Sequence, residues 1–320
     1  MSAAAKGNLA IDDPQASSFI KHLANERGAS EYTIRNYQHT LEEFLQWHLQ
    51  ERNAKAAWPS LGRDDFRGYL RFLGRKKLSR AAIMLRFSAL RSFYKFLFRH
   101  GLVESSPIKG ISMPKAGRRL PRFLTAQQMI DLLRAPAKEL DRLIAAKVDG
   151  VQPAPYLRDA ALLETIYSCG LRISEICGLR AEDINWNEQV VRVRGKGKKE
   201  RDVPIGTPAL EAVRKYWQSL EGSPSAGSPV FTASAHRPAP MSPRVVQIRL
   251  KKYLASAGLD PNLTPHKIRH SYATHMLDAG ADLRSVQELL GHAHLATTQV
   301  YTHVTTERLK RAYDKAHPRA

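Results

Sequence analysis

The chain has 320 residues, of which 43% are hydrophobic, so it is long enough to bury the cores of two domains. It carries 50 Lys and Arg against 30 Asp and Glu, and this formal net charge of +20 favours a polyanionic partner. No apolar run approaches the roughly 18 residues that span a bilayer, and residues 1–8 lack an apolar signal core. We therefore expect a cytoplasmic protein without a membrane partner.

The positive charge is spread along the whole chain. Residues 1–110 carry 18 Lys and Arg against 10 Asp and Glu, and residues 111–320 carry 32 against 20. Two basic halves fit a protein that grips a polyanion from two sides. A generally basic protein without such a partner is the alternative, and an anionic membrane surface is disfavoured because no segment joins a basic face to a strongly apolar one.

Residues 12–105 are predicted to form a small helical domain. Apolar residues recur at helical spacing over residues 30–49 and, more cleanly, over residues 79–100. Four or five such helices would make a bundle. Residues 106–122 follow with three prolines, five basic residues and little periodicity, which indicates an extended interdomain linker.

A second domain, residues 123–320, is predicted to begin with a capping box at Thr125 and Gln128. Residues 190–194 and 201–205 alternate apolar and polar side chains on both sides of a short basic loop, so they predict a β-hairpin. Residues 221–243 are rich in proline and are predicted to be loop, and helices resume after them. The sequence thus predicts a mainly α fold with a small antiparallel β element.

Cys169 and Cys177 lie eight residues apart in what is predicted to be one helical segment. Such a pair is typical of free thiols in a reducing compartment rather than of a disulfide framework.

Chemistry-bearing residues gather in the second domain, beginning with Arg172 and Glu175. At i and i+3 on a helix, the carboxylate can hold the guanidinium in place, although a surface ion pair would give the same pattern. Lys196 lies between two glycines in the predicted hairpin loop, where a phosphate could come close. Such a loop is more often simply solvated.

A second group of candidate residues follows Thr264, the expected N-cap of a helix. Pro265 fits the first helical position, and His266 and Arg269 then share the first turn, where free N–H groups favour an anion. A later helix is predicted to end at Gly291 in the left-handed conformation.

Two further candidates come after that helix end: His292 directly follows it, and Tyr301 lies nine residues further on. A lone tyrosine on a helix is usually a core residue, so the prediction depends on the combination.

The combined set suits a phosphodiester and no metal. No carboxylate cluster is present to hold Mg²⁺, and a zinc site at His266, His270 and His275 is disfavoured because arginine lies between the histidines. Two guanidinium groups can bind the non-bridging oxygens of a phosphate and stabilise its pentavalent transition state. A tyrosine hydroxyl would then act as the nucleophile. We therefore expect no metal ion and no cofactor.

On these motifs the chain resembles the tyrosine recombinase family of the lambda-integrase type, over residues 12–320. Five segments carry the resemblance: Gly-Leu-Arg-Ile-Ser-Glu at 170–175, Gly-Lys-Gly-x-Lys-Glu-Arg at 195–201, His-x-x-Arg-His at 266–270, Leu-Leu-Gly-His at 289–292 and Thr-Thr-Gln-Val-Tyr-Thr-His at 297–303. Residues 316–320 are similar to the end of the bacterial Xer recombinases, and residues 264–277 look closer to the XerC type than to the XerD type.

The resemblance implies that Tyr301 attacks the scissile phosphate and forms a 3′-phosphotyrosyl link. Arg172 and Arg269 would clamp the phosphate, and Lys196 would protonate the leaving 5′ oxygen. His266 would act as general base, and His292 would donate a hydrogen bond to a phosphate oxygen. Glu175 would support Arg172. This agrees with the chemistry, because a phenol with a pKa near 10 needs a proton acceptor and a positive field at neutral pH.

The resemblance also implies a C-shaped, two-domain clamp on double-stranded DNA. Four protomers, including a second, XerD-like recombinase, would resolve chromosome dimers at a dif-like site, with an activating DNA translocase as a further partner. The segment after Thr305 would pack into a neighbouring protomer. Helix residues that could enter the major groove are Arg80, Arg86, Arg244, Gln247 and Arg249. Residues 137–155 look longer than is typical, which leaves local contacts there open.

Two other functions remain open from the sequence. A relaxing enzyme of the type IB topoisomerase kind uses a similar catalytic set but would need no specific site. A DNA-binding regulator without activity would need none of the catalytic residues.

Overall fold

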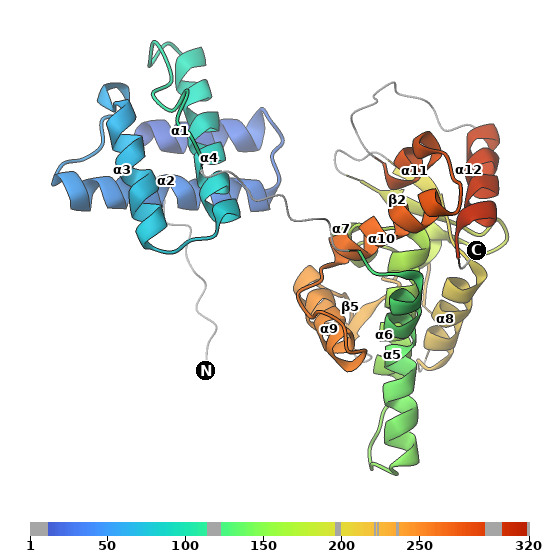
Figure 1. Cartoon of the computed structure of the whole chain (residues 1–320). Coiled ribbons are helices and arrows are strands. Elements are labelled where there is room, and N and C mark those ends of the chain that lie inside the picture. The colour runs from blue at the N-terminus through green and yellow to red at the C-terminus, as the bar shows by residue number, and fades with distance from the viewer. Residues whose placement is uncertain are drawn as a thin grey trace. The chain divides into compact units, whose positions relative to one another are not determined.

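The computed structural model describes residues 12–113, 123–195, 200–220, 222, 224–234, 237–291 and 303–318. The chain divides into two compact units, residues 1–119 and 120–320 (Figure 1). Each unit has its own hydrophobic core. The predicted mainly helical fold with small antiparallel sheets is confirmed. Within the described ranges no helix is long and apolar enough to cross a membrane.

The N-terminal unit is a helical bundle around an aromatic core. Phe44 stacks on Trp58 and Phe66, with ring centroids 5.2 and 5.1 Å apart. Asp13 accepts hydrogen bonds from the Ala16 amide and the Trp58 indole, so one carboxylate caps the first helix and ties it to that core. The elements are α1 (Pro14–Asn25), α2 (Glu31–Arg52), η1 (Trp58–Ser60), α3 (Arg63–Arg75) and α4 (Arg80–Arg99).

The C-terminal unit is built around a central helix, α6 (Ala154–Cys169), which is buried along most of its length. It packs against α5, α8 and α10. Thr125 and Gln128 form the predicted capping box at the start of α5. The remaining helices are α5 (Ala126–Ala145), α7 (Ile173–Cys177), η2 (Ala181–Asp183), α8 (Thr207–Gln218), α9 (Pro243–Ser256), α10 (Pro265–Asp278), α11 (Leu283–Leu290) and α12 (His303–Ala316).

The predicted hairpin is confirmed and gains a third strand. β1 (Ile184–Asn185), β2 (Val190–Arg194) and β3 (Glu200–Pro204) form an antiparallel sheet in that order. The prediction that residues 221–243 are only loop is wrong, because β4 (Thr232–Ser234) pairs with β5 (Arg237–Pro240). Both strands of a two-stranded ribbon are edges, so a proline without an N–H group is tolerated there.

The prediction that the two cysteines share one helical segment is also wrong. Cys169 ends α6 and Cys177 ends α7, with Gly170 between them at φ +57°. Both cysteines are free thiols, as predicted.

The C-terminal helix α12 packs on its own unit, against β3, α10 and α11. Leu309 and Tyr313 are buried, and the Tyr313 hydroxyl lies 2.7 Å from the Ser168 hydroxyl. In the single chain this segment therefore covers its own core.

Candidate active site

The site begins at the corner between α6 and α7, which only glycine can make without a shift of its neighbours. Gly170 is left-handed, and a Cβ there would lie 2.8 Å from Cδ1 of Tyr272 and 3.2 Å from Cδ2 of Leu290. The turn places Arg172 at the N-cap of α7, with Glu175 in its first turn. The two predicted partners are thus set side by side by the backbone.

Glu175 is the centre of the cluster. Its buried carboxylate accepts hydrogen bonds from the backbone N–H of Arg172 (2.8 Å) and from Nη1 of the same residue (2.8 Å). Arg201 binds the same carboxylate bidentately, at 2.9 and 3.0 Å. Burial alone would raise the pKa of Glu175, but the hydrogen bonds and charge of Arg201, followed by those of Arg172, lower this pKa to about 2.

Arg269 joins the same cluster from α10. Its Nη1 atom donates to the Gly170 carbonyl (2.7 Å) and lies 3.9 Å from Oε2 of Glu175, and its Nη2 atom donates to the Leu290 carbonyl. The guanidinium is buried. Burial, followed by the charge of Arg172, lowers the pKa of Arg269 to about 10, as expected for a cation in an excess of positive charge.

Arg201 is a site residue that was not predicted from the sequence. Arg201 lies on β3 at a buried position, and its Nε atom donates to the Leu289 carbonyl at 3.2 Å. Strand alternation puts its side chain on the same face as Val203. A charged residue on the apolar face of a predicted strand was the signal that could have found it.

These four side chains carry three positive charges and one negative charge, so the cluster has a formal net charge of +2. Part of this net positive charge lies at the surface, on Arg172, whose side chain is 43% exposed. Its Nη1 atom donates to Glu175 and its Nη2 atom donates to the Gly291 carbonyl at 3.0 Å. Among the described residues its remaining N–H groups have no hydrogen-bond partner, so they are available to a ligand. An exposed fork of donors backed by buried positive charge suits a phosphate oxygen.

His266 is exposed in the first turn of α10, three residues before Arg269. Thr264 occupies the N-cap position as predicted, but its side chain makes no capping hydrogen bond. Arg269 in the same turn faces the buried cluster and donates to the Gly170 carbonyl. The convergence of His266 and Arg269 on one anion stays a prediction.

His275 has a structural role. Its Nδ1 atom lies 2.8 Å from the Tyr167 hydroxyl, and its Nε2 atom lies 2.8 Å from the Leu124 carbonyl oxygen. His270 is half-buried, and burial followed by the charge of Lys267 lowers its pKa. In the part of the chain that the structure describes, no group of His, Cys, Asp and Glu residues is arranged to hold a metal ion.

Three predicted site residues, Lys196, His292 and Tyr301, lie outside the described residues. In the chain, Lys196 stands five residues before Arg201, and His292 directly follows Gly291.

The residues predicted to read DNA differ in their surroundings. Arg80, Arg244 and Gln247 are exposed. Arg86 is bound to Glu43 and to the Ala82 carbonyl, so its side chain already has a structural role.

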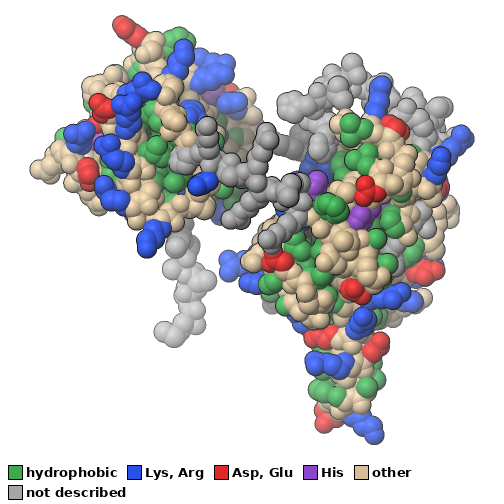
Figure 2. Space-filling model, viewed as in Figure 1, with side chains coloured by type: hydrophobic (Ala, Val, Ile, Leu, Met, Phe, Trp, Pro, Cys, Tyr) green, Lys and Arg blue, Asp and Glu red, His purple; other side chains and the backbone are tan. Residues whose placement is uncertain are grey.

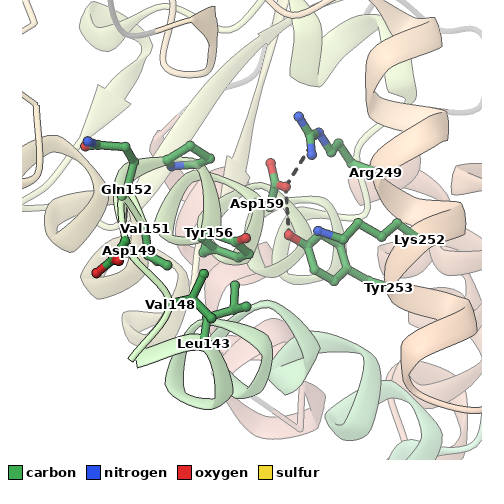
Figure 3. Close-up of a pocket in the computed structure, with 12 residues that line it drawn as sticks. Leu143, Val148, Asp149, Val151, Gln152, Tyr156, Asp159, Arg249, Lys252 and Tyr253 are labelled. Atoms are coloured by element: carbon green, nitrogen blue, oxygen red, sulfur yellow. Dashed lines mark hydrogen bonds and ion pairs between the residues drawn. The ribbon is translucent and has the colours of Figure 1, made fainter. Parts of the chain in front are cut away.

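Arg249 faces a pocket of about 400 Å³, where residues of the 137–155 stretch meet α6 and α9. Figure 3 shows the Arg249 guanidinium and the Tyr253 hydroxyl both directed at Asp159, at 3.8 and 2.9 Å. Lys252 lines the same pocket and forms an ion pair with Glu139 at 2.9 Å. The two basic side chains that line this pocket, Arg249 and Lys252, are thus each paired with a carboxylate.

Comparison with known proteins decides the family. The phage integrase family matches residues 124–308, and the phage integrase N-terminal SAM-like domain matches residues 16–101. The chain belongs to the phage integrase family. It is 38% identical over 319 residues to tyrosine recombinase XerC of Syntrophus aciditrophicus, covering 96% of this chain and 98% of that protein. It is 40% identical over 306 residues to tyrosine recombinase XerC of Alcanivorax borkumensis, covering 95% and 93%.

Solved structures agree on the fold. A lambda integrase dimer bound to a COC′ core site has a TM-score of 0.64 at 17% identity, covering 90% of this chain and 97% of that one. The XerH site-specific recombinase bound to a palindromic difH substrate has a TM-score of 0.65 at 21% identity, covering 93% and 83%. The predicted family, fold class and enzyme class, a site-specific tyrosine recombinase close to the XerC type, are therefore confirmed.

Proposed function

We propose that this recombinase exchanges DNA strands at a dif-like site through a 3′-phosphotyrosine bond made by Tyr301. The observation that carries the proposal is the buried Glu175 carboxylate with three guanidinium groups around it, one of which is offered to solvent by Arg172. The XerC names of the curated relatives and the difH substrate of XerH support the kind of site.

The proposed reaction is an in-line displacement at phosphorus. The phenol oxygen of Tyr301 forms a bond to phosphorus as the bond to the 5′ oxygen breaks, and His266 takes the phenol proton. Lys196 gives a proton to the departing 5′ oxygen. Arg172 and Arg269 stabilise the charge of the pentavalent transition state, and His292 donates to a phosphate oxygen. Attack by a 5′ hydroxyl from another strand reverses these steps, so no cofactor is consumed.

The two units take different parts in this proposal. Residues 12–105 grip double-stranded DNA, residues 106–122 link the units, and residues 123–320 perform the chemistry, so that the protein closes on the duplex as a C-shaped clamp. Figure 2 shows Lys and Arg side chains spread over the visible face of the N-terminal unit, as expected of a surface that binds phosphates. Exposed Arg80, Arg244 and Gln247 are proposed to contact DNA.

The proposed assembly is a cytoplasmic heterotetramer with a second, XerD-like recombinase on DNA, activated by a DNA translocase. The multimers among the solved relatives support a tetramer, since one of them is a lambda integrase tetramer bound to a Holliday junction. In the assembly, the segment after Thr305 leaves its own unit and packs into a neighbouring protomer.

A nicked suicide duplex that carries the cognate site tests the chemistry. The wild-type protein is expected to accumulate a covalent adduct with the DNA, and the Tyr301→Phe variant to form none. Arg172→Lys is expected to slow cleavage sharply while duplex affinity changes little, because lysine lacks the fork. Adduct formation by Tyr301→Phe would overturn the proposal.

A further inference from the structure

We infer that Arg201 is a positioning residue for strand cleavage. It fixes the position of Arg172 because it binds both of the surfaces to which the Arg172 guanidinium donates hydrogen bonds. This inference rests on the proposed function and adds a residue to it. Arg201 itself is buried, so it acts through its neighbours.

The first surface is the Glu175 carboxylate. Arg172 donates to it from its backbone and from Nη1, while Arg201 donates to both of its oxygens. A carboxylate held by a planar fork has one orientation, which a point-charge ammonium would not fix. The ion pair between Arg201 and Glu175 is almost fully buried, so solvent does not weaken it as it would a surface pair.

The second surface is the end of α11. The Nε atom of Arg201 donates to the Leu289 carbonyl, and the Nη2 atom of Arg172 donates to the Gly291 carbonyl two residues later. Gly291 is left-handed at φ +64°, and a Cβ there would lie 3.1 Å from Nε of Arg201. The chain thus turns directly against the Arg201 side chain before it continues to His292.

The position of Arg201 in the sequence adds a third link. It is the second residue of β3, the strand that begins four residues after Lys196 in the sequence. One side chain therefore ties the strand after the proposed general acid to the arginine cluster and to the helix end before His292. Arg192, on the neighbouring strand β2, is the matched control, because it is 58% exposed and pairs only loosely with Asp202 at 3.6 Å.

The test measures single-turnover cleavage of the suicide duplex and duplex affinity for the full-length protein. Arg201→Lys is expected to slow cleavage about 10- to 100-fold with affinity within about threefold, and Arg192→Lys to change neither. In an Arg172→Ala background, adding Arg201→Lys should slow cleavage by less than about a further threefold, because both changes disable the same group. A purely structural role would not produce this coupling.

Several outcomes would overturn the inference. They are cleavage by Arg201→Lys within about threefold of wild type, an equal loss in both backgrounds, or an equal loss of binding. If Arg201→Lys does not fold, Gly291→Ala replaces it, since the added Cβ pushes on Arg201 without removing charge; Gly280→Ala is its control, left-handed at φ +87° with open space around it. Equal cleavage by these two glycine variants would then refute the inference. Failure of the wild-type protein to form an adduct would instead refute the proposed function.

Discussion

Replacing Glu175 by Gln tests the charge balance of the cluster. The glutamine keeps the shape but puts an NH₂ group where a carboxylate oxygen accepts from arginine donors, and it leaves three guanidinium groups without their shared anion. The ordinary pKa of 4.5 and the value of about 2 in the folded protein correspond to about 3 kcal/mol at pH 7, at about 1.4 kcal/mol for each tenfold change in proton affinity. We expect Glu175→Gln to lower the free energy of unfolding by about this amount.

The direction of the pKa shift determines how this stabilisation changes with pH. The folded pKa lies below the unfolded one, so the stabilisation is complete above about pH 5 and is lost as the pH falls towards 2. The difference between wild type and Glu175→Gln, measured by urea unfolding, should shrink by about 1 kcal/mol by pH 4 and by about 2 kcal/mol by pH 3.

Glu182→Gln is the control for this experiment. Glu182 is 41% exposed and lies 3.9 Å from two arginines, so this variant should cost less than about 0.5 kcal/mol. Equal stabilities of the two variants would refute the proposed role of the Glu175 charge. So would a difference between wild type and Glu175→Gln that does not change with pH.

Three further predictions follow from the packing and the surface. Gly170→Ala should cost about 2–4 kcal/mol by thermal unfolding, because its Cβ meets the Tyr272 ring, whereas Gly258→Ala, left-handed with open space, should cost about 1 kcal/mol; equal costs would contradict the contact. His275→Ala should cost about 2–4 kcal/mol yet leave cleavage by the folded protein near wild type, and a specific loss of cleavage would give His275 a catalytic role instead. Arg244→Ala should weaken duplex binding and reduce the slope of log K against log salt by about 1, which titration at several salt concentrations measures; an unchanged slope would remove Arg244 from the DNA surface.

The local structure of the site was largely predictable from sequence. Glycine and capping patterns gave the left-handed turn at Gly291 and the pairing of Arg172 with Glu175, because both depend on residues close together in the chain. The hairpin that contains Arg201 was equally clear from its alternation. These features are set by short-range geometry, which a sequence shows directly.

Long-range pairing was not predictable. The bond from Arg201 to Glu175 joins residues 26 apart, and that from Arg269 to Gly170 joins residues 99 apart. Nothing in the local pattern says which carboxylate or carbonyl a buried arginine will meet. The β4–β5 ribbon was missed for a related reason, since proline-rich segments are local loop signals and only tertiary packing pairs them.

The central claim is that a phenol oxygen becomes bonded to phosphorus in a site assembled from fixed positive charges. Peptide mapping by mass spectrometry, after trapping the adduct on a suicide duplex and digesting protein and DNA, identifies the bonded residue directly. The account predicts a nucleotide attached to the peptide that contains Tyr301, with a free 5′ hydroxyl on the released strand. A nucleotide on any other residue, or a 5′-phosphate link to the protein, would contradict it.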